Sequence, residues 1–353
     1  MAILEVPSAF ATPDLAYAAA VNGDTINIAA GSYTLALATD PAIGGQYTKE
    51  VVIQGATGNP ADVTISAPAD SSAWILINAN NFELRNITFD NTISTSAGYA
   101  IYYVGGTSSI IDNCHINTGN AALYFSNRGY IANRLKVNST RPYADVLPHY
   151  MVAAWGGARD GTIKNSSVTG YFNVAFYDSS NAGNTVIINC SVYMDTSSPR
   201  GLANIIGGFW GSNIYNSACR LETNAAGTSI TDGAIYYQTA FAAGDRGDYN
   251  TVEYPSGPSF GGAAKYANDY DNADVVANGL SIFTDVAALN LHPVRSSLID
   301  QNGDTTKATG TDLDGLAWNN PPSRGALEYV ASGGSGKASI NNLVNLNNLN
   351  NLS

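Results

Sequence analysis

The chain of 353 residues carries a formal net charge of −12, and 12% of its residues are charged, against about 25% in an average globular protein. This acidic balance excludes a partner held mainly through phosphates, because nucleic-acid binding needs clustered lysine and arginine. No run of about 18 apolar residues occurs, so the sequence predicts no membrane span.

Six short segments repeat one pattern, in which an asparagine is flanked by apolar residues at alternate positions. The marker asparagines are 27, 20, 32, 24 and 27 residues apart, and a period of this size is typical of a solenoid. The segments are residues 82–89, 109–116, 130–137, 161–168, 185–192 and 213–219, marked by Asn86, Asn113, Asn133, Asn165, Asn189 and Asn216.

The apolar spacing within each segment predicts strands. In residues 185–192, the apolar Val186, Ile188 and Val192 lie at alternate positions, which is the two-residue period of a strand. We expect a sharp bend at each marker, because asparagine tolerates the left-handed backbone region. Coils stacked about 4.8 Å apart would bring the side-chain amides together, so we predict a hydrogen-bonded asparagine ladder.

This repeat resembles the right-handed parallel β-helix of the pectate-lyase-like superfamily, whose coils carry such an asparagine at one bend. Residues 4–33 and 289–329 are similar to the opening and ending of its bacterial extracellular choice-of-anchor branch. The resemblance implies an all-β, single-stranded solenoid with a short N-terminal capping helix and an extended C-terminal tail. It implies little about chemistry, because the superfamily hosts lyases, hydrolases, adhesins and viral spikes.

The three cysteines are expected to be buried structural thiols. Cys114 and Cys190 directly follow marker asparagines and lie three coils apart, or roughly 14 Å at strand spacing, which is too far for a disulfide. Cys219 also takes an inward position, whereas His115 should point outward. Metal ligation by these residues is therefore not expected.

The long interval before Asn165 contains an insertion, residues 139–157, that we expect to leave the solenoid as a loop. Loops on rigid repeats often carry function, and aromatic faces can stack on sugar rings. The candidate glycan-binding residues are Tyr143, His149, Tyr150, Trp155 and Trp210. The alternative is that these side chains only pack the loop against the solenoid.

Candidates for catalysis are carboxylates expected to face solvent. A glycosidase needs two carboxyl groups about 5 to 9.5 Å apart, and a lyase needs a base beside a cation. The candidates are Asp160, Asp178, Asp245 and Asp248, of which Asp160 and Asp178 could lie on adjacent coils. However, the paired-Asp, Asn-Thr-Asp and Gly-His-Gly signatures of polygalacturonases and the Arg-x-Pro-x-x-Arg stretch of pectate lyases are absent, which favours a non-catalytic protein.

One acidic segment could suggest a Ca²⁺ loop, because alternating carboxylates and carbonyls suit a hard cation. Its candidate ligands are Asp304, Asp312 and Asp314. The segment lacks the twelfth-position glutamate of an EF-hand and matches the terminal turn of the family that the chain resembles. Structural turns are therefore favoured, and no cofactor is expected.

The chain is expected to divide into one elongated β-helix domain (residues 1–330), a Gly/Ser hinge (331–336) and a tail (337–353). Apolar residues recur at every third position of the tail, which suits an extended or three-fold element docked on another chain better than a helix. They are Ile340, Leu343, Leu346, Leu349 and Leu352. We expect attachment to other subunits, with a homotrimer as one such assembly; a disordered tail is the alternative.

Three functions remain open at this point. The chain runs from Met1 directly into domain sequence, without a basic and apolar leader. This favours a virion surface protein, such as a decoration, fibre or spike, that attaches by its tail and binds surface polysaccharide. The alternatives are a secreted polysaccharide lyase or glycoside hydrolase, and a bacterial cell-surface adhesin.

Overall fold

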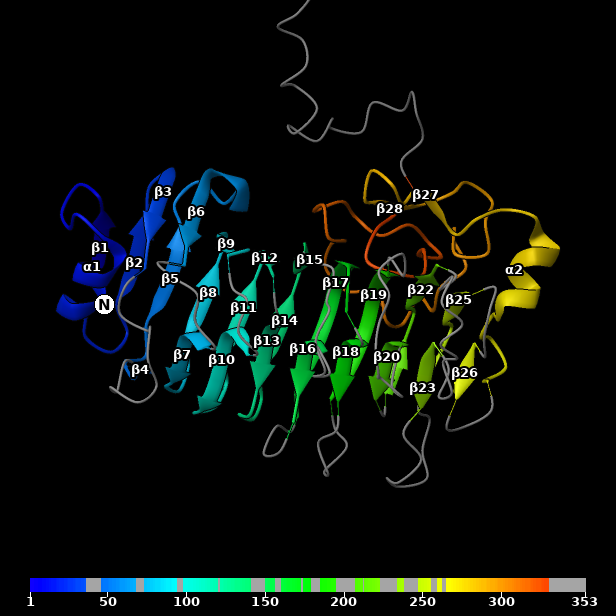
Figure 1. Ribbon diagram of the computed structural model, residues 1–353, viewed down its shortest axis with the longest axis horizontal. Helices are drawn as coiled ribbons and strands as arrows, with labels where there is room; N and C mark the ends of the chain where they lie inside the picture. Colours follow the sequence, from blue (N-terminus) through cyan, green and yellow to red (C-terminus); the bar gives the residue numbers. More distant parts are fainter. Residues whose placement is uncertain are drawn as a thin grey trace, which may run out of the picture.

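The computed structural model arranges the chain as one elongated stack of coils (Figure 1). It describes residues 1–35, 46–67, 73–93, 98–119, 121–140, 150–155, 160–172, 174–178, 185–194, 207–211, 213–222, 234–237, 247–254, 259–261 and 265–329. The predicted hinge and tail therefore lie outside the described residues.

Two parallel sheets run along the stack, with 17 and nine strands in the described part of the chain. In a typical coil, one strand precedes the bend, a second follows it, and a third enters the nine-stranded sheet. The next coil repeats all three and pairs with the first in parallel, as β8, β9 and β10 do with β11, β12 and β13. The chain is thus a parallel β-helix, and the fold predicted from the repeats is confirmed.

The strand bounds follow this three-part coil. Before the bend lie β1 (Ile3–Val6), β2 (Thr25–Ile28), β5 (Val52–Gly55), β8 (Glu83–Arg85), β11 (Ile110–Asp112), β14 (Ile131–Asn133), β21 (Asn213–Tyr215) and β24 (Gly247–Asp248). After it lie β3 (Gly31–Thr34), β6 (Val63–Ser66), β9 (Thr88–Asn91), β12 (His115–Thr118), β15 (Lys136–Ser139), β22 (Ala218–Leu221) and β25 (Thr251–Glu253). Two longer strands, β17 (Thr162–Gly170) and β19 (Val186–Met194), run through the bend.

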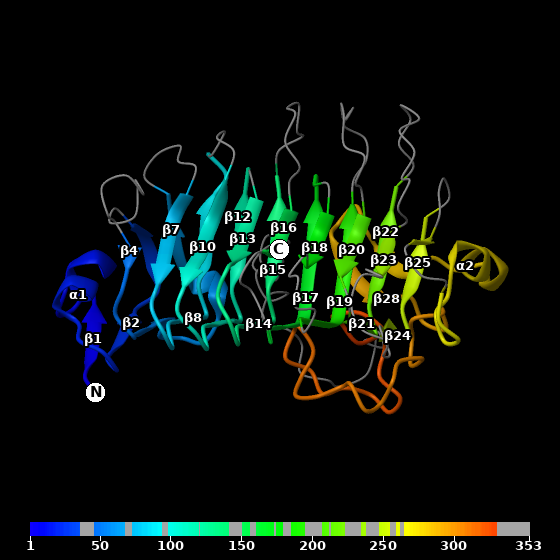
Figure 2. The ribbon, with the colours of Figure 1, turned by 90° about the horizontal axis from the view of Figure 1, so that it is seen from below.

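The nine-stranded sheet forms the opposite side of the stack and is seen face on in Figure 2. Its strands are β4 (Gln46–Tyr47), β7 (Ala73–Asn78), β10 (Tyr99–Gly105), β13 (Ala121–Phe125), β16 (Tyr150–Ala154), β18 (Val174–Asp178), β20 (Gly207–Gly211), β23 (Ile235–Tyr237) and β26 (Phe260–Gly261). Strand β16 corrects one expectation, because it lies inside the insertion that was predicted to leave the solenoid as a loop. Its apolar run Met151–Ala154 is buried, which explains why this part of the insertion joins the sheet.

The asparagine ladder is confirmed at the bends. The marker residues have left-handed φ angles, namely Asn86 (57°), Asn113 (50°), Asn165 (51°), Asn189 (51°) and Asn216 (48°). Their amides bond along the stack: Asn113 Nδ2 donates to Asn86 Oδ1 (2.8 Å), and Asn189 Nδ2 donates to Asn165 Oδ1 (3.1 Å). Asparagine at this position therefore serves both the backbone turn and the contact between coils.

The prediction that Asn133 marks the bend of its coil is wrong by one residue. Strand pairing sets Asn133 opposite Lys164, so the left-handed residue of that coil is Arg134, with φ 51°. Arg134 forms a bidentate ion pair with Asp112, through Nε–Oδ1 (3.1 Å) and Nη2–Oδ2 (2.6 Å). Asn133 nevertheless continues the ladder from the neighbouring position, since its Nδ2 donates to Asp112 Oδ1 (2.7 Å) and its Oδ1 accepts from Asn165 Nδ2 (3.1 Å).

The interior of the stack is apolar and rich in stacked rings. Phe125 stacks on Tyr103 with ring centroids 5.1 Å apart, and on Tyr130 at 4.1 Å. All three cysteines are free and buried, as predicted. Burial raises the pKa of Cys114 and of Cys190 to about 12, so these thiols behave as small apolar side chains.

Each end of the stack carries a short helix. Helix α1 (Pro13–Ala19) begins after Thr12, whose hydroxyl accepts from Leu15 N (3.3 Å), and it has proline at its first position. It buries Ala16 and Tyr17 against the first coil, which confirms the predicted N-terminal capping helix. At the other end, helix α2 (Asn272–Asn278) begins with a capping box.

Residues 280–329, here called the C-terminal layer, fold back over the outside of the stack, on the side away from the nine-stranded sheet (Figure 1). The layer contains the antiparallel pair β27 (Phe283–Asp285) and β28 (Asn290–Pro293). It shares a second apolar core with Tyr193 and Ala218 of the β-helix; its own contribution includes Ile282, Leu291, Ile299, Leu313 and Leu327.

Main-chain and buried polar contacts fix the far end of this layer. Gly325 has φ +105°, and a Cβ there would lie 2.6 Å from Ser191 Oγ, so the close approach requires glycine. Arg324 is 2% exposed, and its Nη1 donates to the carbonyls of Asn250 (3.2 Å) and Asn268 (2.7 Å). Its guanidinium also lies 4.2 Å from the ring centroid of Tyr270. The layer is therefore built against the last coils.

We predict that Asn189→Ala lowers the free energy of unfolding by about 3 to 4 kcal/mol. The left-handed conformation costs an alanine about 1 to 2 kcal/mol, and two hydrogen bonds of about 1 kcal/mol each are lost, one to Asn165 and one to the Lys307 carbonyl. Denaturant unfolding measures this, with Asn189→Gly expected to recover the backbone part. Asn117→Ala on β12 is the control, and equal stability of all variants would contradict the ladder's role.

Candidate functional site

The outer face of the nine-stranded sheet carries a row of aromatic side chains. Successive strands pair so that Tyr102 lies beside Tyr124, and Tyr177 lies beside Trp210. In-register parallel strands place equivalent side chains on the same face. The preceding residues Ile101, Leu123, Phe176 and Phe209 belong to the interior core, whereas Tyr124, Tyr177 and Trp210 belong to a separate cluster. The row therefore faces away from the interior.

The rings of this row are in direct contact. Tyr102 and Tyr124 have centroids 4.5 Å apart in an edge-to-face arrangement, and Tyr99 lies 4.9 Å from Tyr124. One coil further on, Tyr150 stacks on Tyr177 at 4.0 Å. These separations fall at or near the range of favourable aromatic pairs, about 4.5 to 7 Å. We call the set Tyr99, Tyr102, Tyr124, Tyr150, Trp155, Tyr177 and Trp210 the aromatic face.

Trp155 is the most exposed member of the aromatic face. It is 45% exposed, whereas Tyr150 and Tyr177 are 5% and 8% exposed. Its ring lies 6.3 Å from Tyr150 and 5.8 Å from Tyr177, and Tyr177 in turn lies 6.0 Å from Trp210. The indole ring of Trp155 is therefore exposed to solvent and packs against the buried rings of Tyr150 and Tyr177.

The aromatic face is uncharged at ordinary pH. Burial, together with neighbouring tyrosines, raises the pKa of both Tyr124 and Tyr150 to about 12. The same causes raise the pKa of Tyr99 further. Because these hydroxyls stay protonated, they can act as both donors and acceptors of hydrogen bonds.

Three of the five predicted glycan-binding residues meet on this face, namely Tyr150, Trp155 and Trp210. Tyr143 and His149 lie outside the described residues. The prediction missed Tyr99, Tyr102, Tyr124 and Tyr177. Tyrosine at matching positions of successive third strands was the available signal, but it becomes visible only once the strand register is known.

Asp160 and Asp178, the two candidate catalytic aspartates expected on adjacent coils, lie in different surroundings. Asp160 is about half exposed, and its Oδ2 lies 3.4 Å from Arg128 Nη2. The expectation that Asp178 faces solvent is wrong, because it is fully buried. It pairs in register with the core residue Ala154, so the alternation of β18 turns it inward.

The remaining candidate aspartates are engaged or not described. Both oxygens of Asp248 accept bonds from Asn268, to its main-chain N at 3.0 Å and its Nδ2 at 2.7 Å. Asp245 lies outside the described residues. Asp160, Asp178 and Asp248 are thus held by an ion pair, by burial in the core and by hydrogen bonds, respectively.

The three candidate metal ligands have local structural partners. Asp304 Oδ1 accepts from the main chain and side chain of Thr306, both at 2.8 Å, which is a turn stabilised by its own aspartate. Asp312 is fully buried and accepts from the main-chain N of Leu316 (2.7 Å). Asp314 pairs with a histidine. Within the described ranges, no group of three or more His, Cys, Asp or Glu side chains could hold a metal ion.

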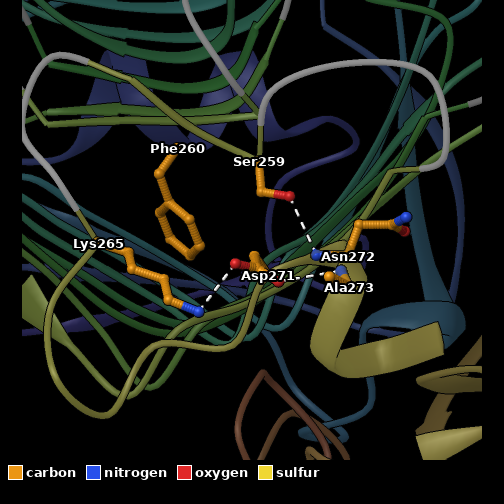
Figure 3. A pocket seen from close by; sticks show the side chains of 6 residues that line it. All are labelled: Ser259, Phe260, Lys265, Asp271, Asn272 and Ala273. Atoms are coloured by element: carbon orange, nitrogen blue, oxygen red, sulfur yellow. Dashed lines mark hydrogen bonds and ion pairs between the residues drawn. The ribbon is translucent and has the colours of Figure 1, made fainter. Parts of the chain in front are cut away.

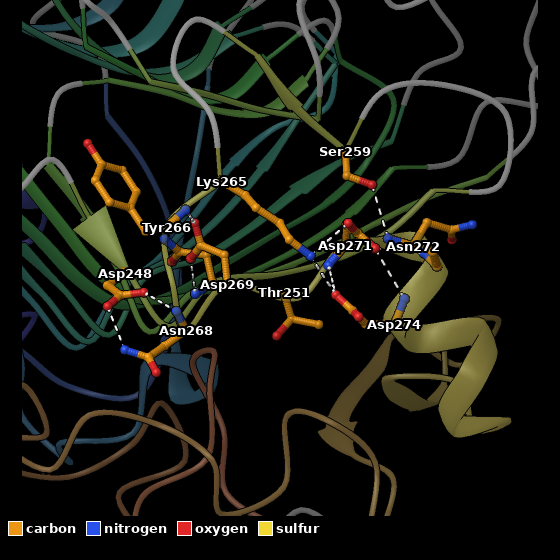
Figure 4. Close-up of polar contacts among 12 residues, drawn as sticks. Asp248, Thr251, Ser259, Lys265, Tyr266, Asn268, Asp269, Asp271, Asn272 and Asp274 are labelled. Atoms are coloured by element: carbon orange, nitrogen blue, oxygen red, sulfur yellow. Dashed lines mark hydrogen bonds and ion pairs between the residues drawn. The ribbon is translucent and has the colours of Figure 1, made fainter.

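An open hollow of about 400 Å³ lies at the C-terminal end of the stack (Figure 3). It is lined by Ser259, Phe260, Lys265, Asp271, Asn272 and Ala273. Lys265 Nζ lies 2.8 Å from Asp271 and 2.9 Å from Asp274 (Figure 4), and Asp271 also caps helix α2. Because these charged groups bind one another, they are better explained as contacts that stabilise the last coil than as ligands for a bound molecule.

No helix in the described part of the chain is long and apolar enough to cross a membrane.

No protein-family model matches the chain, and no curated protein does either. Among solved structures, the chain is similar to pectate lyase Pel9A, with 12% identity, 94% of this chain and 97% of that chain covered, and a TM-score of 0.37. It is also similar to the A-module of the Azotobacter vinelandii mannuronan C-5 epimerase AlgE6, with 14% identity, coverage of 72% and 91%, and a TM-score of 0.37.

The activities of these two enzymes are not transferred to this chain, because the identities and TM-scores are low. The β-helix assignment rests on the strand pairings of the chain itself.

We predict that Tyr124 and Tyr150 ionise near pH 12, two units above an ordinary tyrosine. A spectrophotometric titration should show late steps that Tyr124→Phe and Tyr150→Phe each reduce, without changing the step near pH 10. Loss of amplitude from the step near pH 10 instead would mean that these hydroxyls are freely hydrated.

Proposed function

We propose that this protein is a non-catalytic, adhesive β-helix protein whose aromatic face binds surface polysaccharide. The observation that carries the proposal is the contact of Tyr150, Trp155 and Tyr177, which holds an exposed indole on a rigid sheet. Aromatic rings present apolar faces on which the C–H faces of sugars can stack, and protonated tyrosine hydroxyls can bond to sugar hydroxyls.

The rigidity of the sheet supports binding. Tyr150 and Tyr177 are nearly fully buried and stacked with an interplanar angle of 9°, so ordering them on a ligand costs little conformational entropy. The strands beneath them are held on both sides by neighbouring coils. The face is therefore pre-organised before any ligand arrives.

The surroundings of two candidate catalytic aspartates support binding without cleavage. Asp178 is enclosed in the core and Asp160 is paired with Arg128 on the surface. The alternative, a secreted polysaccharide lyase or glycoside hydrolase, would need an acid and base placed about a sugar. Release of new reducing ends or unsaturated products from a polysaccharide panel would favour that alternative over our proposal.

We predict that Trp155→Ala weakens polysaccharide binding about 2- to 10-fold, because stacked aromatic contacts contribute roughly 0.5 to 1.5 kcal/mol. Affinity electrophoresis in gels containing neutral and acidic polysaccharides measures the change. Leu15→Ala is the control, since Leu15 is 55% exposed on α1 at one end of the stack. Equal retardation of wild type, Trp155→Ala and Leu15→Ala would refute the proposed surface.

Placement on a virion, with attachment through residues 337–353, is part of the same proposal, and a bacterial cell-surface adhesin is its alternative. The support is the three-residue period of Ile340, Leu343 and the leucines that follow. We predict that deleting residues 337–353 abolishes assembly with other subunits while leaving the β-helix folded, as measured by light scattering and circular dichroism. Unchanged assembly would remove this role for the tail.

A further inference from the structure

One side chain joins three segments of the C-terminal layer at its edge. His292, on β28, has Nδ1 2.6 Å from the main-chain oxygen of Glu328 and Nε2 3.1 Å from Asp314 Oδ2. Asp314 belongs to the turn that follows Asp312, and Asp312 Oδ2 accepts from the main-chain N of Glu328 (3.0 Å). The strand, the turn and the end of the layer thus meet at His292.

The β-helix faces the same cluster with two cationic or titratable groups. His115 on β12 and Lys136 on β15 are neighbours in register, and both interact electrostatically with Asp314. The groups that face His292 are therefore Asp314 and Asp312 from the layer, while His115 and Lys136 face Asp314 from the β-helix. The Glu328 carboxylate is engaged elsewhere, accepting from Ser323 Oγ (2.7 Å).

We propose that the His292–Asp314 ion pair is a proton-dependent latch, which fastens strand β28 to the turn at Asp314 and to the end of the C-terminal layer and which loosens as pH rises. The layer covers apolar surface at Tyr193 and Ala218. Loosening the latch would weaken the packing of the layer over β19 and β22, while the bonds at Asn189 and Asn216 remain. This inference is independent of polysaccharide binding, because the aromatic face lies on the other sheet.

The direction of the pH dependence follows from His292. Burial alone would lower its pKa, but the hydrogen bonds with Asp314 and the Glu328 carbonyl outweigh burial and raise the pKa above 6.5. A histidine with a raised folded-state pKa stabilises the fold fully below its unfolded value, and this contribution is lost as pH rises through the folded value. The latch is therefore closed in mild acid and weakened in mild alkali.

The neighbouring groups do not reverse this direction. The hydrogen bond from His292 lowers the pKa of Asp314, so Asp314 stays ionised until strong acid. Burial and Lys136 lower the pKa of His115 to about 4, so it is neutral throughout. Burial raises the pKa of Asp312 to about 6, and its ionisation between about pH 4 and 6 weakens the layer in the same direction.

Hydrogen–deuterium exchange of the full chain between pH 6 and 9 tests the latch, after correction for the intrinsic pH dependence of exchange. Protection of peptides from residues 282–329 should fall with rising pH, by up to about tenfold for each unit by which the folded pKa of His292 exceeds the unfolded one. Peptides from the β10 and β13 strands serve as the internal reference and should not change.

Two variants separate the latch from a general effect of pH. His292→Gln should show lower protection at pH 6 and no dependence above it, whereas His115→Gln should keep the wild-type dependence. Equal dependence in wild type and His292→Gln, or none in wild type, would overturn the proposal. If His292→Gln does not fold, the proton-detected titration of His292 in the wild type decides, because a pKa at or below 6.5 also overturns it.

Discussion

The structure depends on one backbone constraint, the left-handed residue that turns seven successive coils, from Asn86 to Tyr249, at the same point. Such a conformation costs most residues about 1 to 2 kcal/mol, and asparagine reduces this cost through local hydrogen bonding. Because coils stack in register, the side chain that eases the turn also meets its equivalent in the next coil, as Asn165 meets Asn189. Turn and stacking therefore select the same residue type, and each reinforces the other.

This coupling explains why so much of the fold could be predicted from sequence. A repeated asparagine between alternating apolar residues reports both the bend and the strands beside it. The prediction went wrong by one residue at Asn133, because Arg134 takes the left-handed position. The ladder survives there because Asp112 accepts from both side chains. A charged pair can thus supplement the amide contacts where the stack leaves it half-buried, and a pattern based on asparagine alone finds that coil but misplaces its left-handed residue.

The aromatic face was less predictable for a physical reason. Its residues come from third strands that contain no asparagine marker, and their alignment is set by loops of unequal length. Aromatic content alone pointed to Tyr150, Trp155 and Trp210, but Tyr177 joins them only because β16 and β18 pair in register. Asp178 shows the same limit, since its inward direction follows from that register and not from its charge.

The ladder also determines where the C-terminal layer can bind. At the last coils, the ladder amides turn from bonding one another to bonding the layer: Asn216 Nδ2 donates to the Asp304 carbonyl (3.0 Å), and Asn216 Oδ1 accepts from Asp304 N (2.7 Å). Asn189 does both, donating to Asn165 and to the Lys307 carbonyl. The layer is thus fixed at the bend by uncharged bonds, whereas its opposite edge is closed by His292 and Asp314. Because His292 lies at that edge, a change in pH near neutrality acts on one side of the layer while the ladder continues to hold the other.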